Sequence, residues 1–148
     1  MAGLQTFDSS VLIPWLRDGS YDQLVTASFT ARQFMLCTVV WMELYAGTRS
    51  ASDKQDLDQM VQALADVGRV ISPQPEDFYQ AGQMVAYYSR QYGAIQPRDH
   101  ANDILIALCA SRTNATLITE NKEHMEKWQR ILKRSRRRLD LQYVSRAQ

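Results

Sequence analysis

Apolar residues along the chain follow two alternating patterns, which are short continuous runs and longer stretches with apolar positions three or four residues apart. The short runs, typical of buried β-strands, lie at residues 4–7, 34–37, 69–72, 116–119 and 141–144. The longer stretches, typical of amphipathic helices, lie at residues 11–16, 21–32, 38–46, 52–68, 75–93, 104–111 and 122–134. The pattern therefore predicts strands and helices that alternate along the whole chain.

Residues suited to helix ends precede most of these helices. The candidate starting residues are Asp8, Ser9, Ser10, Thr38, Ser52, Pro75, and either Asp99 or Asn102. In the helix from Pro75, apolar spacing indicates an inward face with Phe78, Ala81, Gly82 and Val85. In the last helix, the same spacing predicts that Met125, Trp128, Ile131 and Leu132 point inward.

Short strands that alternate with helices indicate the α/β class, with a small parallel sheet flanked by helices. Ligand sites in open parallel sheets lie beyond the carboxyl ends of the strands. Asp8 and the segment from Thr119 to Asn121 directly follow predicted strands. We therefore expect one α/β domain whose functional site lies near these residues.

The overall composition excludes several classes of protein. The chain has 148 residues, of which 45% are hydrophobic and 22% charged, and these values argue against disorder, collagen-like repeats and coiled coil. The longest apolar run, 104–110, is much shorter than the roughly 20 residues of a membrane-spanning helix. No secretion signal is visible, so we expect no membrane segment and a cytoplasmic location. Cys37 and Cys109 lie in apolar stretches and are predicted to be reduced core thiols.

The small net charge of +1 conceals a basic block near the end of the chain. Residues 127–138 contain seven of the 17 basic residues and none of the 16 acidic ones. Such a block is typical of a surface that binds a polyanion or an acidic protein segment, although a solvated helix face would look the same. The candidate contact residues are Arg130, Lys133, Arg134, Arg136, Arg137 and Arg138.

Several common catalytic motifs do not occur. The six glycines match neither a dinucleotide-binding nor a phosphate-binding loop, and there is no G-x-S-x-G motif. Neither histidine has a metal-binding partner four residues further on. These observations argue against dinucleotide-binding, P-loop and serine-hydrolase classes.

Three acidic residues stand singly beside apolar segments. Asp8 follows a strand, Glu43 interrupts the apolar run 39–45, and Asp103 precedes the run 104–108. Asp8 and Asp103 could each cap a helix, and Glu43 could point outward or pair with an arginine. A shared divalent cation would satisfy all three acids at once, and ligands that are all oxygens favour Mg²⁺ or Mn²⁺ over zinc.

Around these acids the sequence resembles the PIN-domain ribonucleases, and most of all the VapC-type toxins of bacterial toxin–antitoxin pairs. The matching stretches are residues 6–13 around Asp8, 40–47 around Glu43, 103–107 from Asp103 onward, and 117–121, which is similar to a strand-to-helix T-x-N turn. They follow the order and approximate spacing of the family over nearly the whole chain. The resemblance thus implies a PIN-like nuclease domain over residues 1–148, with a basic C-terminal helix around 122–138.

One position departs from the family pattern. Such proteins usually place another aspartate three residues after the T-x-N asparagine, whereas this chain has His124 there. Glu120 and Glu123 are possible replacements for the fourth acid, and both could equally be solvent-exposed residues. His124 and Ser9 are left without an assigned role.

The resemblance implies a metal-dependent endoribonuclease, the toxin of a type II toxin–antitoxin pair. In that reading Asp8, Glu43 and Asp103 are catalytic; Asp8 and Asp103 bind Mg²⁺ or Mn²⁺, with Glu43 and Glu120 as further candidate ligands. Thr119 and Asn121 would orient the scissile phosphate or the metal ligands. The implied partners are an RNA substrate, a cognate antitoxin protein and a second copy of the chain in a homodimer.

Two other classes stay open at this stage. A PIN-like module weakened by loss of the fourth acid could bind RNA or a protein without cleavage. A phosphoacceptor receiver domain shares the α/β layout, but it needs paired acids after the first strand, where this chain has Asp8 followed by Ser9 and Ser10.

Overall fold

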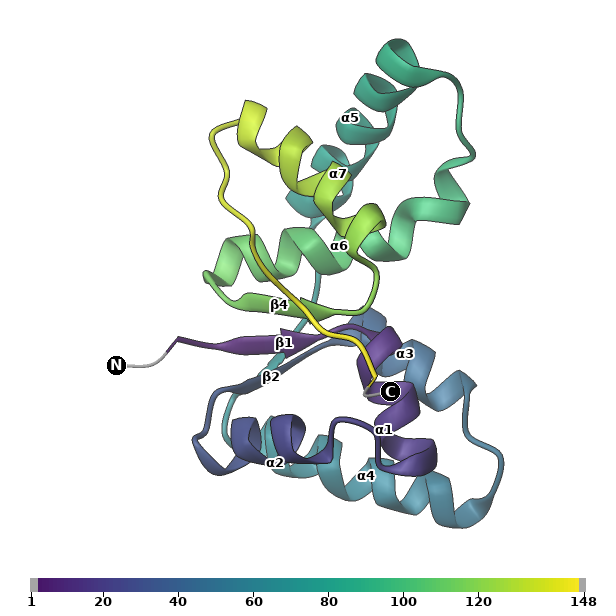
Figure 1. Cartoon of the computed structure of the whole chain (residues 1–148), viewed down its shortest axis with the longest axis vertical. Helices are drawn as coiled ribbons and strands as arrows, with labels where there is room; N and C mark the ends of the chain where they lie inside the picture. Colours follow the sequence, from purple (N-terminus) through teal and green to yellow (C-terminus); the bar gives the residue numbers. More distant parts are fainter. Residues whose placement is uncertain (1–2, 147–148) are drawn as a thin grey trace.

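A parallel β-sheet forms the centre of the computed structural model, which describes residues 3–146 (Figure 1). Its strands are β1 (Gln5–Phe7), β2 (Phe34–Cys37), β3 (Val70–Ile71), β4 (Thr116–Thr119) and β5 (Asp140–Tyr143), in the order β3-β2-β1-β4-β5. Each neighbouring pair runs parallel, with Phe7 beside Ile118 and Thr6 beside Met35 in register. The prediction of an α/β fold with a small parallel sheet is confirmed.

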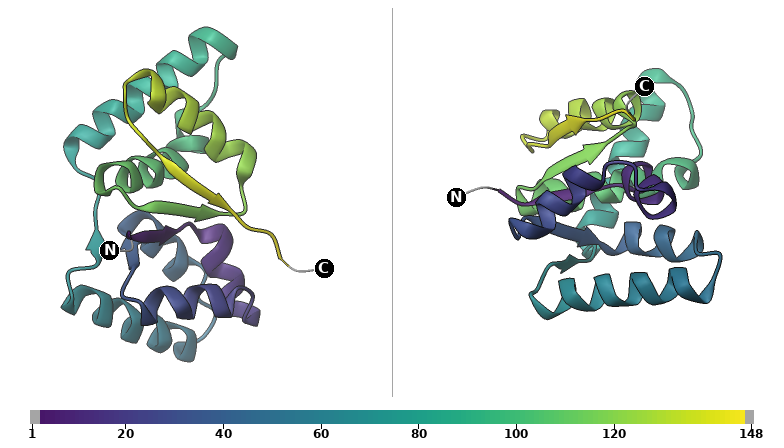
Figure 2. Two further views of the ribbon diagram at one scale, coloured as in Figure 1. Left: turned by 60° about the vertical axis from the view of Figure 1, so that its left-hand side comes forward. Right: turned by 60° about the horizontal axis from the view of Figure 1, so that its bottom comes forward.

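Helices form the connections between the parallel strands. They are α1 (Ser9–Asp18), α2 (Asp22–Thr30), α3 (Thr38–Ala46), α4 (Ala51–Asp66), α5 (Pro75–Tyr92), α6 (Pro97–Thr113) and α7 (Lys122–Arg134). Figures 1 and 2 show α5, α6 and α7 gathered together near β4 and β5, while α2 and α4 lie together beyond β2. Since β1 is the central strand and β1 and β4 are neighbours, the loops that follow these two strands lie side by side.

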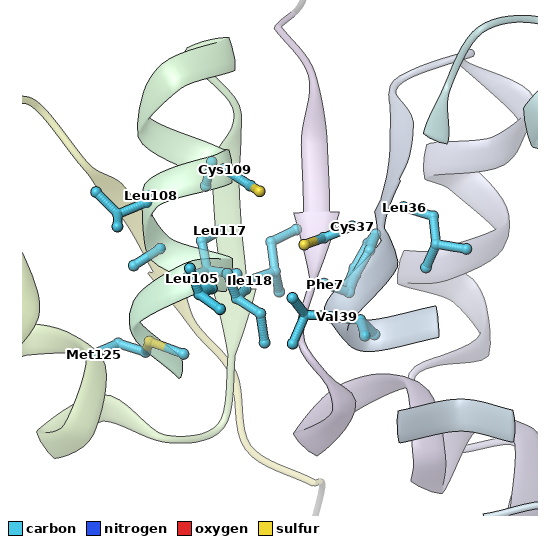
Figure 3. Packing of buried hydrophobic residues seen from close by; sticks show 14 of the residues in the cluster. Phe7, Leu36, Cys37, Val39, Leu105, Leu108, Cys109, Leu117, Ile118 and Met125 are labelled. Atoms are coloured by element: carbon cyan, nitrogen blue, oxygen red, sulfur yellow. The ribbon is translucent and has the colours of Figure 1, made fainter. Parts of the chain in front are cut away.

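The core lies between the sheet and these helices (Figure 3). Phe7 from β1 and Ile118 from β4 are fully buried, and the apolar run at residues 104–110 of α6 is buried throughout. Cys37 and Cys109 are free and buried, as predicted, and Figure 3 shows their side chains pointing toward one another. Met125, Trp128, Ile131 and Leu132 of α7 complete this core, which confirms the inward face predicted for that helix.

Two helices begin at residues other than those expected. Ser50, not Ser52, caps α4, because its Oγ accepts a hydrogen bond from the Asp53 amide at 3.0 Å. The apolar helix α6 begins already at Pro97, not at Asp99 or Asn102, since proline is well suited to the first helical turn. Asp103 consequently lies inside α6 and does not cap it.

One further expectation about a helix face was wrong. Phe78, expected on the inner face of α5, is 57% exposed, whereas Ala81 and Met84 are buried. The basic C-terminal helix, expected around 122–138, covers Lys122–Arg134, the range that the apolar spacing predicts, and the basic residues continue beyond it. After the helix the Arg137 amide bonds the Leu132 carbonyl, and Arg136 has a φ of 58°. This closure lets Leu139 enter the core before β5, and it leaves three arginines in the connecting turn.

Across residues 3–146, the helices are all too short or too polar to cross a membrane.

Candidate active site

Asp8 lies between the end of β1 and the start of α1. It is the N-cap of α1, and its Oδ1 accepts a hydrogen bond from the Ser10 amide at 3.1 Å. Its Oδ2 accepts a second hydrogen bond from the Thr119 hydroxyl at 2.5 Å. The Asp8 side chain is therefore held by the start of α1 and the end of β4 at once, at the carboxyl edge of the sheet.

Burial makes the ionised form of Asp8 costly. Only 2% of the residue is exposed, and this desolvation raises its pKa from 3.8 to about 6. Hydrogen bonds from Ser10 and Thr119 lower the pKa, whereas the negative charge of Asp103 raises it further. A positive charge near Asp8 would remove much of this cost.

Glu43 reaches the same region from α3. Desolvation raises its pKa, the side chains of Ser9 and Asn102 oppose the rise, and the charges of Asp103 and Asp8 add to it. Its Oε1 is buried and has no hydrogen-bond partner within residues 3–146. A buried carboxylate oxygen without a partner is uncommon in folded proteins and indicates a missing cation, water or ligand group.

Asp103 comes from the second turn of α6 and carries the third carboxylate. Its Oδ2 lies 3.6 Å from Nδ1 of His124, in the first turn of α7, and the Asp103 side chain is 25% exposed. The electrostatic influence of Asp103 on both Asp8 and Glu43 shows that the three acids from β1–α1, α3 and α6 share one region.

Thr119 and Ser10 connect the acids to the end of β4. The buried Thr119 hydroxyl donates to Asp8 and accepts a hydrogen bond from the Asn121 amide at 2.9 Å. The Ser10 hydroxyl bonds the other carboxylate oxygen of Asp8 and accepts from the Glu120 amide at 2.9 Å. Sequence reasoning did not single out Ser10 as a site residue, although its position two residues after Asp8 is that of an Asx turn.

Asn121 occupies the N-cap position of α7. Its carbonyl accepts a hydrogen bond from the Met125 amide at 3.1 Å, and its side chain is exposed and makes no capping hydrogen bond. The side-chain amide of Asn121 is therefore free to contact a ligand that approaches from solvent.

The carboxylate of Glu120 contacts a tyrosine and an arginine that lie outside the group of three acids. Its carboxylate accepts a hydrogen bond from the Tyr21 hydroxyl, and Nε of Arg146 lies 3.1 Å from its Oε2. Glu123, the other candidate for the missing acid, is exposed in the first turn of α7. That Glu120 binds a metal stays a prediction, and any such role would compete with Arg146.

The basic block lies mainly at the other end of α7 from the acids. The helix begins at Lys122, beside the carboxyl edge of the sheet, and its 13 residues extend for about 20 Å. Two of the arginines have local acidic partners, Arg130 with Glu126 at 3.3 Å and Arg138 with Asp140 at 2.7 Å. Lys133, Arg134 and Arg136 are exposed, and Arg137 bonds the Gln80 amide oxygen.

The donors at this edge suit a hard divalent cation. Asp8, Glu43 and Asp103 supply only oxygen atoms, and their mutual repulsion and burial would be relieved by Mg²⁺ or Mn²⁺. Within the described part of the chain, no three His, Cys, Asp or Glu side chains already converge into a complete metal-binding set. Cation binding at this edge would therefore need small side-chain movements.

Taken together, the parallel sheet and the three carboxylates at its carboxyl edge define an α/β domain with an acidic candidate site. A family model described as "PIN domain" matches residues 6–130, most of the chain. The chain belongs to the PIN-domain family, and the resemblance inferred from its sequence is confirmed.

Solved structures extend the similarity of fold beyond the family model. The chain is 20% identical to a chain of VapBC2 from Rickettsia felis bound to a promoter DNA fragment, covering 96% of this chain and 99% of that one, with a TM-score of 0.64. A chain of DNA-bound VapBC from Salmonella typhimurium is 15% identical, with 96% of this chain and 98% of that one covered and a TM-score of 0.66. A chain of VapBC-1 from nontypeable Haemophilus influenzae is 16% identical, with 95% of this chain and 97% of that one covered and a TM-score of 0.63. No curated protein matches the chain in sequence.

Proposed function

We propose that the protein is a metal-dependent endoribonuclease that hydrolyses RNA phosphodiester bonds and acts as the toxin of a type II toxin–antitoxin pair. The observation that carries the proposal is the meeting of Asp8, Glu43 and Asp103 at one edge, with raised pKa values for Asp8 and Glu43 and an unpartnered Glu43 oxygen. Membership of the PIN-domain family supports it, since PIN domains are generally nucleases.

Each residue has a distinct part in this proposal. Asp8 and Asp103 would hold Mg²⁺ or Mn²⁺, and Thr119 and Ser10 orient Asp8 through the hydrogen bonds described above. Glu43 would be a third ligand or a base that aligns the attacking water. The chemistry that a divalent cation supplies when bound is activation of water and neutralisation of charge at the phosphodiester. Asn121, exposed at the start of α7, would orient the scissile phosphate.

A protein partner is also part of the proposal. The solved structures of similar fold are VapBC and FitAB complexes, which supports an antitoxin that silences this chain. Two large apolar side chains on α3, Trp41 and Met42, are exposed beside Glu43, as expected for a surface that a protein covers. A homodimer of this chain stays a further prediction.

Cleavage of RNA by the purified chain tests the proposed activity. We expect single-stranded and looped RNA to be cut in Mg²⁺ or Mn²⁺ and to stay intact with a chelator, because an accessible backbone suits a compact site. Asp8→Asn and Asp103→Asn should each lower the cleavage rate by at least about a hundredfold, since each removes a charge that positions the cation. Asp99→Asn, an exposed acid in the first turn of α6, serves as the matched control. Full activity of both site variants would refute the assignment.

A second function is favoured by His124, which stands where the family places an acid. A chain that binds RNA with either metal but never cuts it would be a weakened PIN-like module. The same assay separates the two functions, provided that binding is measured alongside cleavage.

A further inference from the structure

A groove between α5 and α7 combines aromatic and cationic side chains beside the acidic edge. Figures 1 and 2 show the two helices next to each other, and the groove between them has a volume of ≈ 470 Å³. Its lining includes Tyr87, Tyr88, Tyr92, Lys127, Arg130 and Arg134. None of these tyrosines has a place in the metal site described above.

Two of the tyrosine rings pack against each other and against a buried tryptophan. Tyr88 lies over the fully buried Trp128, with ring centroids 5.7 Å apart, and Tyr92 lies beside Tyr88 at 5.0 Å. Tyr92 is 68% exposed, so a large part of its ring is open to solvent. An open aromatic ring on a rigid support is a surface on which a nucleobase can stack.

The cations stand over these rings without acidic partners. Nζ of Lys127 is 5.1 Å from the Tyr88 centroid, and Cζ of Arg134 is 4.5 Å from the Tyr87 centroid. Between residues 3 and 146 neither cation forms a salt bridge, in contrast to Arg130 with Glu126. The outer plane of the Arg134 guanidinium can also stack on a base, while Lys127 can neutralise a phosphate.

The groove ends at the candidate active site. His124 lines it and lies 3.6 Å from Asp103, so the groove continues from the acids along α7. From His124 to Arg134 the helix rises by about 15 Å, which is the length of roughly four stacked nucleotides.

We propose that this groove binds the single-stranded RNA segment next to the scissile phosphodiester, with bases on Tyr92 and Arg134 and a phosphate on Lys127. The inference rests on the proposed function, because it takes the three acids as the point of cleavage. A single strand fits better than a duplex, whose bases are already stacked and cannot reach Tyr92. Unpaired cations favour a polyanion over an apolar protein surface.

The test measures binding, so that it does not depend on cleavage. The intact chain is titrated in chelator onto a fluorescein-labelled single-stranded RNA of about twelve nucleotides, and Kd is taken from anisotropy. We expect Tyr92→Ala to weaken binding by roughly fivefold or more and Tyr92→Phe to retain it, because a base stacks on either ring. Tyr79→Ala is the matched control, since Tyr79 is equally exposed on α5 but outside the groove.

A salt series tests the phosphate contacts separately. Lys127→Gln should reduce the slope of log Kd against log salt concentration by about 0.7, the value for one phosphate on a single strand. Arg90→Gln removes the same charge from the exposed end of α5 outside the groove and should leave the slope nearly unchanged. An RNA that carries 2-aminopurine should lose fluorescence on binding the wild type and keep it with Tyr92→Ala.

Equal RNA affinity of Tyr92→Ala and Tyr79→Ala would overturn the groove assignment. If the groove variants bound RNA normally but changed the sedimentation of the chain, the groove would be a protein interface and the inference would be wrong. A chain that binds RNA through the groove and never cleaves it would refute the proposed activity alone. A chain that cleaves RNA with unaltered groove variants would refute the groove alone.

Discussion

At the scale of single residues, Asp8 combines two features, a helix cap and a place in the acidic cluster, that sequence reasoning treated as alternatives. It caps α1 through the Ser10 amide, and it is also the most deeply buried of the three acids at the carboxyl edge. Capping alone would favour an exposed carboxylate with a low pKa, whereas the pKa of Asp8 is raised to about 6 by burial. The raised pKa reflects the free-energy cost of an ionised carboxylate at this buried position.

This cost predicts how stability depends on pH. The pKa of Asp8 is about 6 when folded and 3.8 when unfolded, so the folded state binds more protons between these values and loses stability as pH rises through them. The penalty is complete above pH 6 and is on the order of 3 kcal/mol. In chelator, we expect the free energy of unfolding of Asp8→Asn relative to wild type to increase from pH 4.5 to pH 7.5. Asparagine still caps the helix but loses the hydrogen bond from Thr119, so the charge is read from the pH-dependent part of the difference.

Asp18 provides a control of opposite sign. Its pKa is lowered by hydrogen bonds from Ser20, so its charge stabilises the folded state as pH rises. In urea unfolding, Asp18→Asn should be less stable than wild type by a constant amount between pH 4.5 and pH 7.5, and the deficit should shrink only as the pH falls below about 4. An unchanging deficit for Asp8→Asn at every pH would mean that Asp8 acts chiefly as a cap.

His124 determines how much negative charge the site presents. An imidazole cannot supply the negative charge that helps hold Mg²⁺, so we expect weak Mg²⁺ affinity and better activity with Mn²⁺, which accepts nitrogen ligands more readily. His124→Asp places a carboxylate beside Asp103 and should tighten Mg²⁺ binding, by calorimetry, by roughly tenfold or more. Glu123→Gln, which changes the exposed neighbour, should have no effect. Unchanged Mg²⁺ affinity and cleavage in His124→Asp would place residue 124 outside the metal site.

At the scale of elements, a buried ion pair joins α5 to α6. Asp77, 1% exposed, accepts hydrogen bonds from Nη2 of Arg112 at 3.0 Å and from the Gln74 amide at 2.8 Å. Arg112 also donates to the Ser72 carbonyl at 2.9 Å. The pair therefore ties the start of α5 and the β3–α5 link to the end of α6, the helix that carries Asp103.

Removal of one member of this pair should cost more than removal of both. Arg112→Met leaves the Asp77 charge buried without a partner, and we expect a loss of about 3 kcal/mol or more in the free energy of unfolding. Adding Asp77→Asn to Arg112→Met should recover part of that loss, as measured by urea unfolding of the double-mutant cycle. Simple additivity of the two substitutions would show that the ion pair contributes little.

At the scale of the whole molecule, periodicity was enough to predict the α/β class and most of the elements, whereas the family was inferred from the resemblance of four short stretches around Asp8, Glu43, Asp103 and Thr119. The order of strands could not be predicted, because a parallel pairing such as β1 with β4 joins residues more than a hundred positions apart. For the same reason the link from Thr119 to Asp8 and the groove between α5 and α7 were not visible in the sequence. The predicted first residues of α4 and α6 were wrong because Ser50 and Pro97 initiate these helices better than the residues chosen.

The two ends of α7 have a consequence for how a substrate arrives. One end adjoins three carboxylates and the other leads into a run of arginines, so a chain with a net charge of only +1 has a large electric dipole. The electric field of this dipole steers an approaching polyanion, which therefore meets the arginine-rich end first, before any cation has neutralised the acids. Association should consequently slow as ionic strength rises and the Debye length falls below the span of the helix. Under the proposed function, capture and cleavage would then be successive events at opposite ends of one helix.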